Sequence, residues 1–176
     1  MPADVLTIRE RIMREVERRL RTMKAGSPSG DPYQVEFALV TRGGSLEAMH
    51  DSENSGCSVI DSDERKVARI QQMACQLVVV VEFVAWVSVD DESPSEVGNR
   101  YLGAVQRRMR EDIHFTEPDD GARSELDRQL AHNVVEVRNQ LFVDGAYDRK
   151  VTGAAFYEVS YKHGISDPRI RVGTGF

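Results

Sequence analysis

Hydrophobic and polar residues follow each other along this chain in patterns that predict a helix, strands, a second helix and further strands. Residues 7–24 and 95–114 repeat apolar side chains every three or four positions, which is the period of an amphipathic helix. Residues 34–41, 133–143 and 151–162 alternate apolar with polar or smaller side chains, which is the period of a strand. This order predicts a single α/β (α+β) domain with an antiparallel or mixed β-sheet and two main helices packed on one face.

The most apolar stretch is residues 74–89, which contains neither glycine nor proline and is rich in valine. This composition predicts a central strand that is covered on both faces in its middle. An unbroken strand of this length would span roughly 50 Å. A domain of this size has a radius of gyration of about 16 Å, so we expect the strand to bend, to break or to extend onto a neighbouring copy. The run is too short for a membrane span and is interrupted by Glu82.

A strand that extends beyond its own domain would expose Val84, Trp86 and Val87 as an apolar patch, which monomeric proteins rarely tolerate. We therefore expect these residues to pack against a second copy of the chain. Head-to-tail contacts that close on themselves form a ring. Glu82 and Trp86 lie on the same face of the predicted strand, so both are expected at this contact.

The end of the chain offers a partner for that surface. Residues 163–176 contain Pro168 and glycines, and we expect them to form an extended arm. An arginine of this arm, Arg169 or Arg171, is expected to meet Glu82 of the next copy. The predicted subunit interface therefore consists of Glu82, Val84, Trp86, Arg169 and Arg171.

Two connecting regions lack a clear period. Residues 42–64 contain one basic and six acidic residues, which predicts a long acidic loop with a short strand at 57–60. Loops longer than about 15 residues are usually functional or disordered, so we expect this loop to be a contact or channel-lining element that is not needed for folding. Residues 66–72 lead into the central strand. They form either one arm of a hairpin with that strand or the beginning of the strand itself. Residues 124–132 have only weak helical periodicity.

Composition narrows the class of protein. The 176 residues are enough for one domain with a proper core, and 40% hydrophobic and 30% charged residues are typical of a soluble globular protein. The net charge of −6 argues against non-specific binding to nucleic acid. Residues 1–24 differ from the rest of the chain because their net charge is positive. The glutamates between their arginines favour a solvated, ion-paired helix face over a nucleic-acid or membrane site. Two cysteines make no disulfide framework, and without a signal peptide we expect a cytosolic protein with no membrane contact.

Motifs for catalysis or cofactor binding are not found in the sequence, so we predict no enzymatic activity, no cofactor and no metal. The four histidines lack metal-binding spacing, and the residues after Asp61 and Asp63 lack the glycine and glutamate of a calcium loop. Glu82 is the one charged residue in the apolar run. It is either a catalytic carboxylate or, more commonly, a residue that pairs with an arginine or meets a subunit interface. A small metal-dependent nuclease using Glu82 with Asp61 or Asp63 is the enzyme alternative.

Four segments carry a resemblance to a known family. They are the opening helix T-I-R-E-R-I-M-R-E-V-E-R-R-L, the strand Q-L-V-V-V-V-E-F-V-A-W, the helix N-R-Y-L-G-A-V-Q-R-R-M-R-E-D and the closing A-A-F-Y-E-V-S-Y-K-H-G-I-S-D-P. In their order and spacing they resemble the tail terminator family of long-tailed bacteriophages, also called tail-completion or minor tail proteins. The resemblance spans nearly the whole chain and fits residues 133–145 least well.

The resemblance implies a structural virion protein at the head-proximal end of the tail, assembled in the host cytoplasm. Such a protein forms a homo-oligomeric ring, usually a hexamer, on the last ring of tail-tube proteins. There it stops polymerisation and joins the tail to the head connector or neck protein. A tail sheath is a further partner that the family allows, and DNA passes through only as cargo. Another head-to-tail connector protein, such as a neck or adaptor protein, is the nearest alternative.

Overall fold

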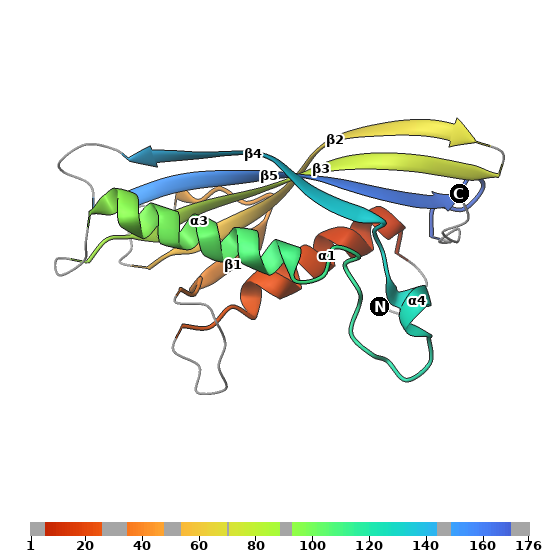
Figure 1. Cartoon of the computed structure of the whole chain (residues 1–176), viewed down its shortest axis with the longest axis horizontal. Coiled ribbons are helices and arrows are strands. Elements are labelled where there is room, and N and C mark those ends of the chain that lie inside the picture. Colours follow the sequence, from red (N-terminus) through yellow and green to blue (C-terminus); the bar gives the residue numbers. More distant parts are fainter. Residues whose placement is uncertain are drawn as a thin grey trace.

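The computed structural model describes residues 6–25, 35–47, 54–69, 71–88, 93–143 and 149–169. These residues form an α+β domain around a mixed five-stranded sheet in the order β1-β2-β3-β5-β4 (Figure 1). β1 is parallel to β2, and the other neighbouring pairs are antiparallel. The elements are α1 (Ile8–Arg21), β1 (Leu39–Arg42), β2 (Gly56–Arg69), β3 (Gln72–Trp86), α3 (Pro94–Arg110), α4 (Glu125–Arg128), β4 (Asn133–Val143) and β5 (Lys150–Gly164).

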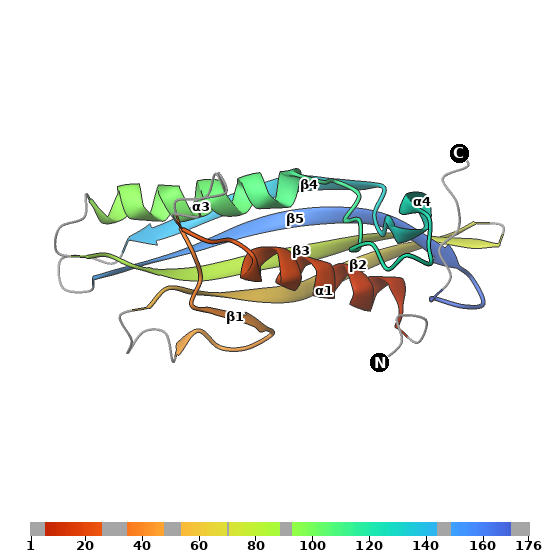
Figure 2. The same ribbon diagram turned by 90° about the horizontal axis from the view of Figure 1, so that it is seen from below.

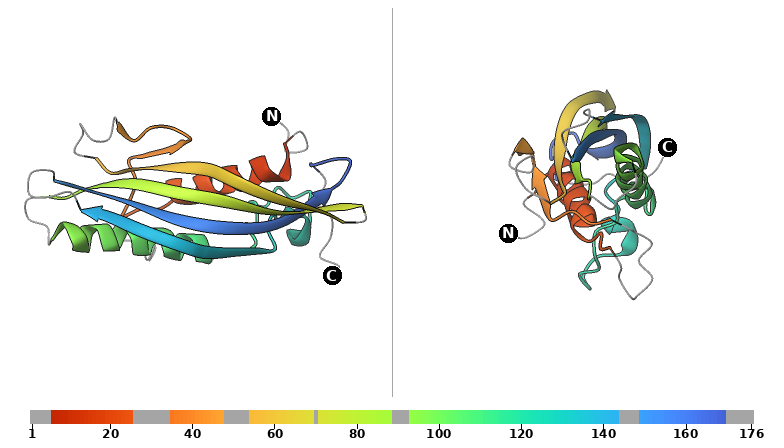
Figure 3. Two further views of the ribbon diagram at one scale, coloured as in Figure 1. Left: turned by 90° about the horizontal axis from the view of Figure 1, so that it is seen from above. Right: turned by 90° about the vertical axis from the view of Figure 1, so that its left-hand side faces the viewer.

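The two long helices pack on the same face of the sheet, as the sequence predicts (Figure 2). The Thr7 side chain caps α1 by accepting a hydrogen bond from the Glu10 amide. Ser93 caps α3 in a reciprocal arrangement with Glu96. The opposite face, which we call the open face, carries no helix among the described residues (Figure 3).

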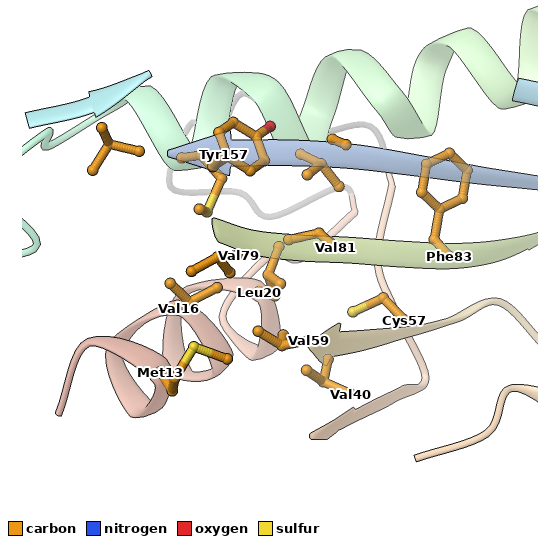
Figure 4. Close-up of a cluster of buried hydrophobic side chains, with 14 of the residues drawn as sticks. Met13, Val16, Leu20, Val40, Cys57, Val59, Val79, Val81, Phe83 and Tyr157 are labelled. Atoms are coloured by element: carbon orange, nitrogen blue, oxygen red, sulfur yellow. The ribbon is translucent and has the colours of Figure 1, made fainter. Parts of the chain in front are cut away.

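The main core lies between the sheet and the two helices (Figure 4). The apolar positions of α1 are buried at the spacing that the sequence indicates, and they meet alternate residues of β2 and β3. Gly153 of β5 allows the tightest contact, because a Cβ atom there would lie 2.4 Å from Cζ of Phe83. Labelled core residues in Figure 4 are Met13, Val16, Leu20, Val40, Cys57, Val59, Val79, Val81, Phe83 and Tyr157.

The central strand is confirmed, but of the three predicted alternatives two are wrong, since the strand neither breaks nor extends past its own domain. β3 is unbroken and pairs along its whole length with β5, which also has 15 residues, while β2 on its other side has 14. The whole sheet is therefore elongated, and the molecule is much longer than it is thick (Figure 2). The estimate from a spherical domain does not apply to this shape. Val84 and Val87 are only 1% and 6% exposed, so the expected apolar patch is absent there.

The long acidic loop is also shorter than predicted. β2 begins at Gly56, so residues 56–64 are strand, and the expected short strand at 57–60 is its first part. The carboxylates of Asp61 and Glu64 do not break the strand, because Arg9 of α1 pairs with both, at 2.7 and 3.3 Å. Residues 66–69 form one arm of a β2–β3 hairpin. Residues 48–53 of the loop lie outside the described residues.

Two further corrections concern the ends of predicted elements. The first predicted strand, 34–41, is observed only from residue 39 onward, and β1 ends one residue later than predicted, at Arg42. At the carboxyl end, His163 and Gly164 still belong to β5, and the following residues turn back instead of extending. The Pro168 carbonyl there accepts a hydrogen bond from the Ile8 amide at the start of α1. Residues 170–176, including Arg171, lie outside the described residues.

All six arginines of α1 form ion pairs, so the expected ion-paired helix face is present. Arg11 and Arg19 are buried, however, and reach the residues that follow α3. The helix therefore fastens separate parts of the chain together as well as facing solvent. The pairs are Arg9–Asp61, Arg11–Glu117, Arg14–Glu10, Arg18–Glu15, Arg19–Asp112 and Arg21–Glu17.

Candidate interaction surface

Strand β4 is the most exposed apolar element of the sheet. It is 11 residues long, or roughly 36 Å, and it forms one edge, with β5 as its only neighbour among the described strands. Its other side therefore presents unpaired backbone groups. Four of its apolar side chains are about half exposed: Val135 (47%), Val137 (56%), Phe142 (56%) and Val143 (48%). A long apolar edge strand is a template for pairing with another chain, and proteins normally shorten, charge or cover such an edge.

A bulge changes which side chains β4 presents. The register with β5 shifts between Glu136 and Arg138, which leaves Val137 unpaired and exposed. Beyond the bulge, Phe142 pairs with Thr152 on the open face. Phe142 and Glu82 line the same shallow hollow of about 240 Å³ on that face. The edge and the open face therefore form one continuous surface.

A larger groove of about 530 Å³ lies on the open face at the end where β2 turns into β3. We call it the basic groove, because its lining contains three cationic side chains and no carboxylate. Among the described residues, Arg65 and Arg69 form no ion pair. Val67, which is 47% exposed, and Ala74 give the groove apolar surface. The lining residues are Arg65, Val67, Arg69, Ala74, Cys75, Gln76, His132, Asn133, Ser160, Tyr161 and Lys162.

Of the residues that the sequence predicts as a subunit interface, Glu82, Val84 and Trp86 lie on one strand, β3, and Glu82 and Val84 line the same hollow. Their contact with an arginine of a second copy stays a prediction. Glu82 is exposed on the open face, and Trp86 is half-buried beside Lys150, whose Nζ lies 5.7 Å from the indole centroid. Val84 is buried within its own chain and has almost no surface to offer a neighbour. Arg169 pairs with Asp167 at 2.6 Å, two residues away in the same turn.

The residues of the nuclease alternative are not brought together. Asp61 lies on the helix side of the sheet, where it pairs with Arg9, whereas Glu82 lies on the open face. Burial alone would raise the pKa of Asp61, but the hydrogen bond and charge of Arg9 lower it overall. Among the residues that the structure describes, no group of three or more His, Cys, Asp and Glu side chains could hold a metal ion. Burial raises the pKa of the Cys57 thiol, which makes it a poor nucleophile.

Comparison with models of known protein families gives no match, and no curated protein matches this chain significantly. No helix in the described part of the chain is long and apolar enough to cross a membrane. The candidate surface therefore has to be argued from its own geometry.

Sequence reasoning identified β4 as a strand but missed its exposure. A signal was present, because residues 134–135 and 141–143 are consecutive apolar residues and so place apolar side chains on both faces of a short strand. Such a pattern indicates either a strand buried on both faces or an apolar surface. Only the strand order, which puts β4 at the edge, distinguishes the two.

Proposed function

We propose that this chain is a structural protein of the bacteriophage tail, of the tail terminator class, which acts as a ring of identical subunits. In this function the ring, expected to be a hexamer, binds the last ring of tail-tube proteins, stops their polymerisation and offers a surface to the head connector. The observation that carries the proposal is the exposed apolar edge of β4. A free edge with Phe142, Val137 and two further valines is suited to permanent contact with a second copy.

Two other features support a structural role. The order of helix, hairpin, helix and hairpin agrees with the segments that carry the family resemblance. The helix side is extensively fastened by ion pairs and apolar packing, whereas the β4 edge, the hollow beside Glu82 and the basic groove remain accessible. This asymmetry suits a subunit whose contacts with neighbours differ from side to side, as ring formation requires.

The proposal is tested first by assembly. We expect the purified protein to form rings that are visible by electron microscopy and whose subunit number is given by native mass spectrometry. Phe142→Ala should weaken assembly, because truncating an aromatic anchor typically costs about 2 kcal/mol or more, which is roughly a 30-fold change in dissociation constant. Ile113→Ser removes a comparably exposed apolar side chain outside β4 and should leave assembly unchanged.

Termination itself requires the tail-tube protein encoded in the same genome. Added to polymerising tubes, the wild-type protein should bind one end and limit tube length, and Phe142→Ala should do so less well. Rings that form but leave tube length unchanged would favour another head-to-tail connector. A protein that remains monomeric both alone and with the tube protein would contradict the proposal.

A further inference from the structure

The loop between α3 and β4 is held rigidly although most of it is exposed. Thr116 and Gln129 form a β-bridge that closes its two ends, and we call residues 116–129 the α4 loop. Glu117 is the central fastening point, since it accepts two hydrogen bonds from the buried Arg11 at 2.9 and 2.5 Å and one from Arg123 at 2.6 Å. A loop that is already ordered loses less entropy on binding.

The α4 loop presents an apolar side chain between carboxylates. Leu126 is 56% exposed, and no residue of α4 is buried. Glu125 is exposed next to it in the sequence. Asp119, seven positions earlier in the loop, has a side chain that is 73% exposed, and its Oδ1 lies 3.9 Å from Nε of Arg128. The two arginines in the segment are occupied within the loop, because Arg123 binds Asp120 and Arg128 donates to the Glu117 carbonyl. The exposed part of the loop is therefore acidic around a leucine.

The basic groove has the complementary composition. Arg65, Arg69 and Lys162 supply positive charge, while Val67 and Ala74 supply apolar surface. The groove is positive although the chain as a whole carries a net charge of −6. Acidic and basic patches that meet across an interface fix the register and exclude wrong partners.

The groove and the loop lie at the same end of the molecule but on opposite sides of the sheet. α4 lies on the helix side, near the end where the β2–β3 hairpin turns (Figure 1). The groove is lined mainly by residues of β2, β3 and β5 near that end. Figure 3 shows the sheet from this side, with both long helices behind it. Because the sheet stands between them, one copy cannot place its loop in its own groove. Contacts between two different surfaces of identical chains are head-to-tail, and they form rings when the rotation closes.

We propose that the α4 loop of one copy inserts Leu126 into the basic groove of the next copy, with Glu125 and Asp119 facing Arg65 and Arg69. This inference rests on the proposed ring function and specifies one of its contacts. Asn133 lines the groove and begins β4, so the groove continues into the exposed surface of that strand. The inserted loop and the β4 edge then belong to one subunit interface.

Charge reversal tests this contact in the full-length protein. Arg69→Glu should raise the dissociation constant of the assembly at least tenfold, measured by sedimentation equilibrium and native mass spectrometry. Lys24→Glu makes the same change of charge at an exposed site outside the groove and should behave as wild type. Leu126→Asp should weaken assembly as strongly as Arg69→Glu. Combining Arg69→Glu with Glu125→Arg should restore at least part of the lost affinity. Thermal melting of each variant checks that the subunit remains folded.

The outcomes separate this contact from ring formation in general. Loss of assembly in both single variants, with recovery in the combined variant, supports the inserted loop. If both single variants assemble as wild type does while Phe142→Ala does not, the loop contact is overturned and the proposed ring stands. If the combined variant stays as weak as the single ones, the specific pairing of loop and groove is overturned. Wild-type protein that never self-associates overturns both the contact and the ring.

Discussion

Strands β3 and β4 are both rich in valine, yet they have opposite roles in this molecule. β3 lies in the centre of the sheet, and most of its apolar side chains are buried within the chain, including Val84 near its end. β4 lies at an edge, and four of its apolar side chains are about half exposed. The comparison shows that apolar composition identifies a strand, whereas its place in the sheet decides whether it stabilises the fold or offers a contact.

The largest expected difference between the two strands is in the stability of the single subunit. Phe83 of β3 is buried beside Phe37 and Tyr101, so Phe83→Ala should destabilise the subunit by about 3–5 kcal/mol. Phe142→Ala in β4 should change the free energy of unfolding by no more than about 0.5 kcal/mol. Urea unfolding at concentrations where the protein is monomeric measures both values. Similar losses in the two variants would contradict the assignment of β4 to an interface.

Gly153 of β5 connects the two strands, since it lies between Phe83 of β3 and Leu141 of β4. A Cβ atom at this position would approach these side chains to 2.4 and 2.7 Å. We expect Gly153→Ala to destabilise the subunit by about 1–3 kcal/mol through overpacking. Gly103→Ala in α3 is the matched control, because nothing lies within 4 Å of its added Cβ. Removing a helical glycine should stabilise the protein by about 0.5–1 kcal/mol. If Gly153→Ala left the free energy of unfolding unchanged, the sheet would adjust to the added Cβ atom more easily than its packing indicates.

A fall in pH should loosen the α4 loop, which leads into β4, before it affects β3. Partial burial raises the pKa of Glu117, but the hydrogen bonds and charges of Arg11 and Arg123 lower it overall, below its ordinary value of 4.5. A carboxyl group whose pKa is lowered by folding stabilises the protein above the unfolded value, and this contribution is lost as the pH falls through the folded value. Asp112, which lies just before this loop, has a lowered pKa as well, despite its burial, through hydrogen bonds from Thr116 and His114 and the charge of Arg19.

Hydrogen exchange measures this effect, once rates are corrected for their intrinsic pH dependence. Residues 116–129 should lose protection as the pH falls below about 4.5, while the central part of β3 remains protected. Glu117→Gln should loosen the same residues already at neutral pH, with a loss of about 1–3 kcal/mol in the free energy of opening the loop. Equal loss of protection in β3 would mean that the loop and the central sheet unfold together.

Much of the fold was determined locally and could be predicted. Apolar residues at every third or fourth position place α1 within one residue of its observed start and three residues of its observed end. The alternation in residues 133–143 gives the observed bounds of β4. The hairpin of β2 and β3 was one of two predicted alternatives, and the β-branched composition of the hydrophobic run correctly predicted the strand β3. These features depend on periodicity and capping, which act over a few neighbouring residues.

The candidate surface, by contrast, depended on contacts between distant parts of the chain. The acidic residues of β2 suggested a loop because the sequence does not reveal that Arg9, more than 50 positions away, neutralises Asp61. Val84 looked available for a neighbour because the similar lengths of β2, β3 and β5 cannot be judged before the strands are paired. In the same way, Leu126 and Val67 are ordinary apolar residues in the sequence. Only the tertiary structure places Leu126 on the acidic α4 loop and Val67 in the basic groove. Burial and charge pairing depend on which segments meet in space.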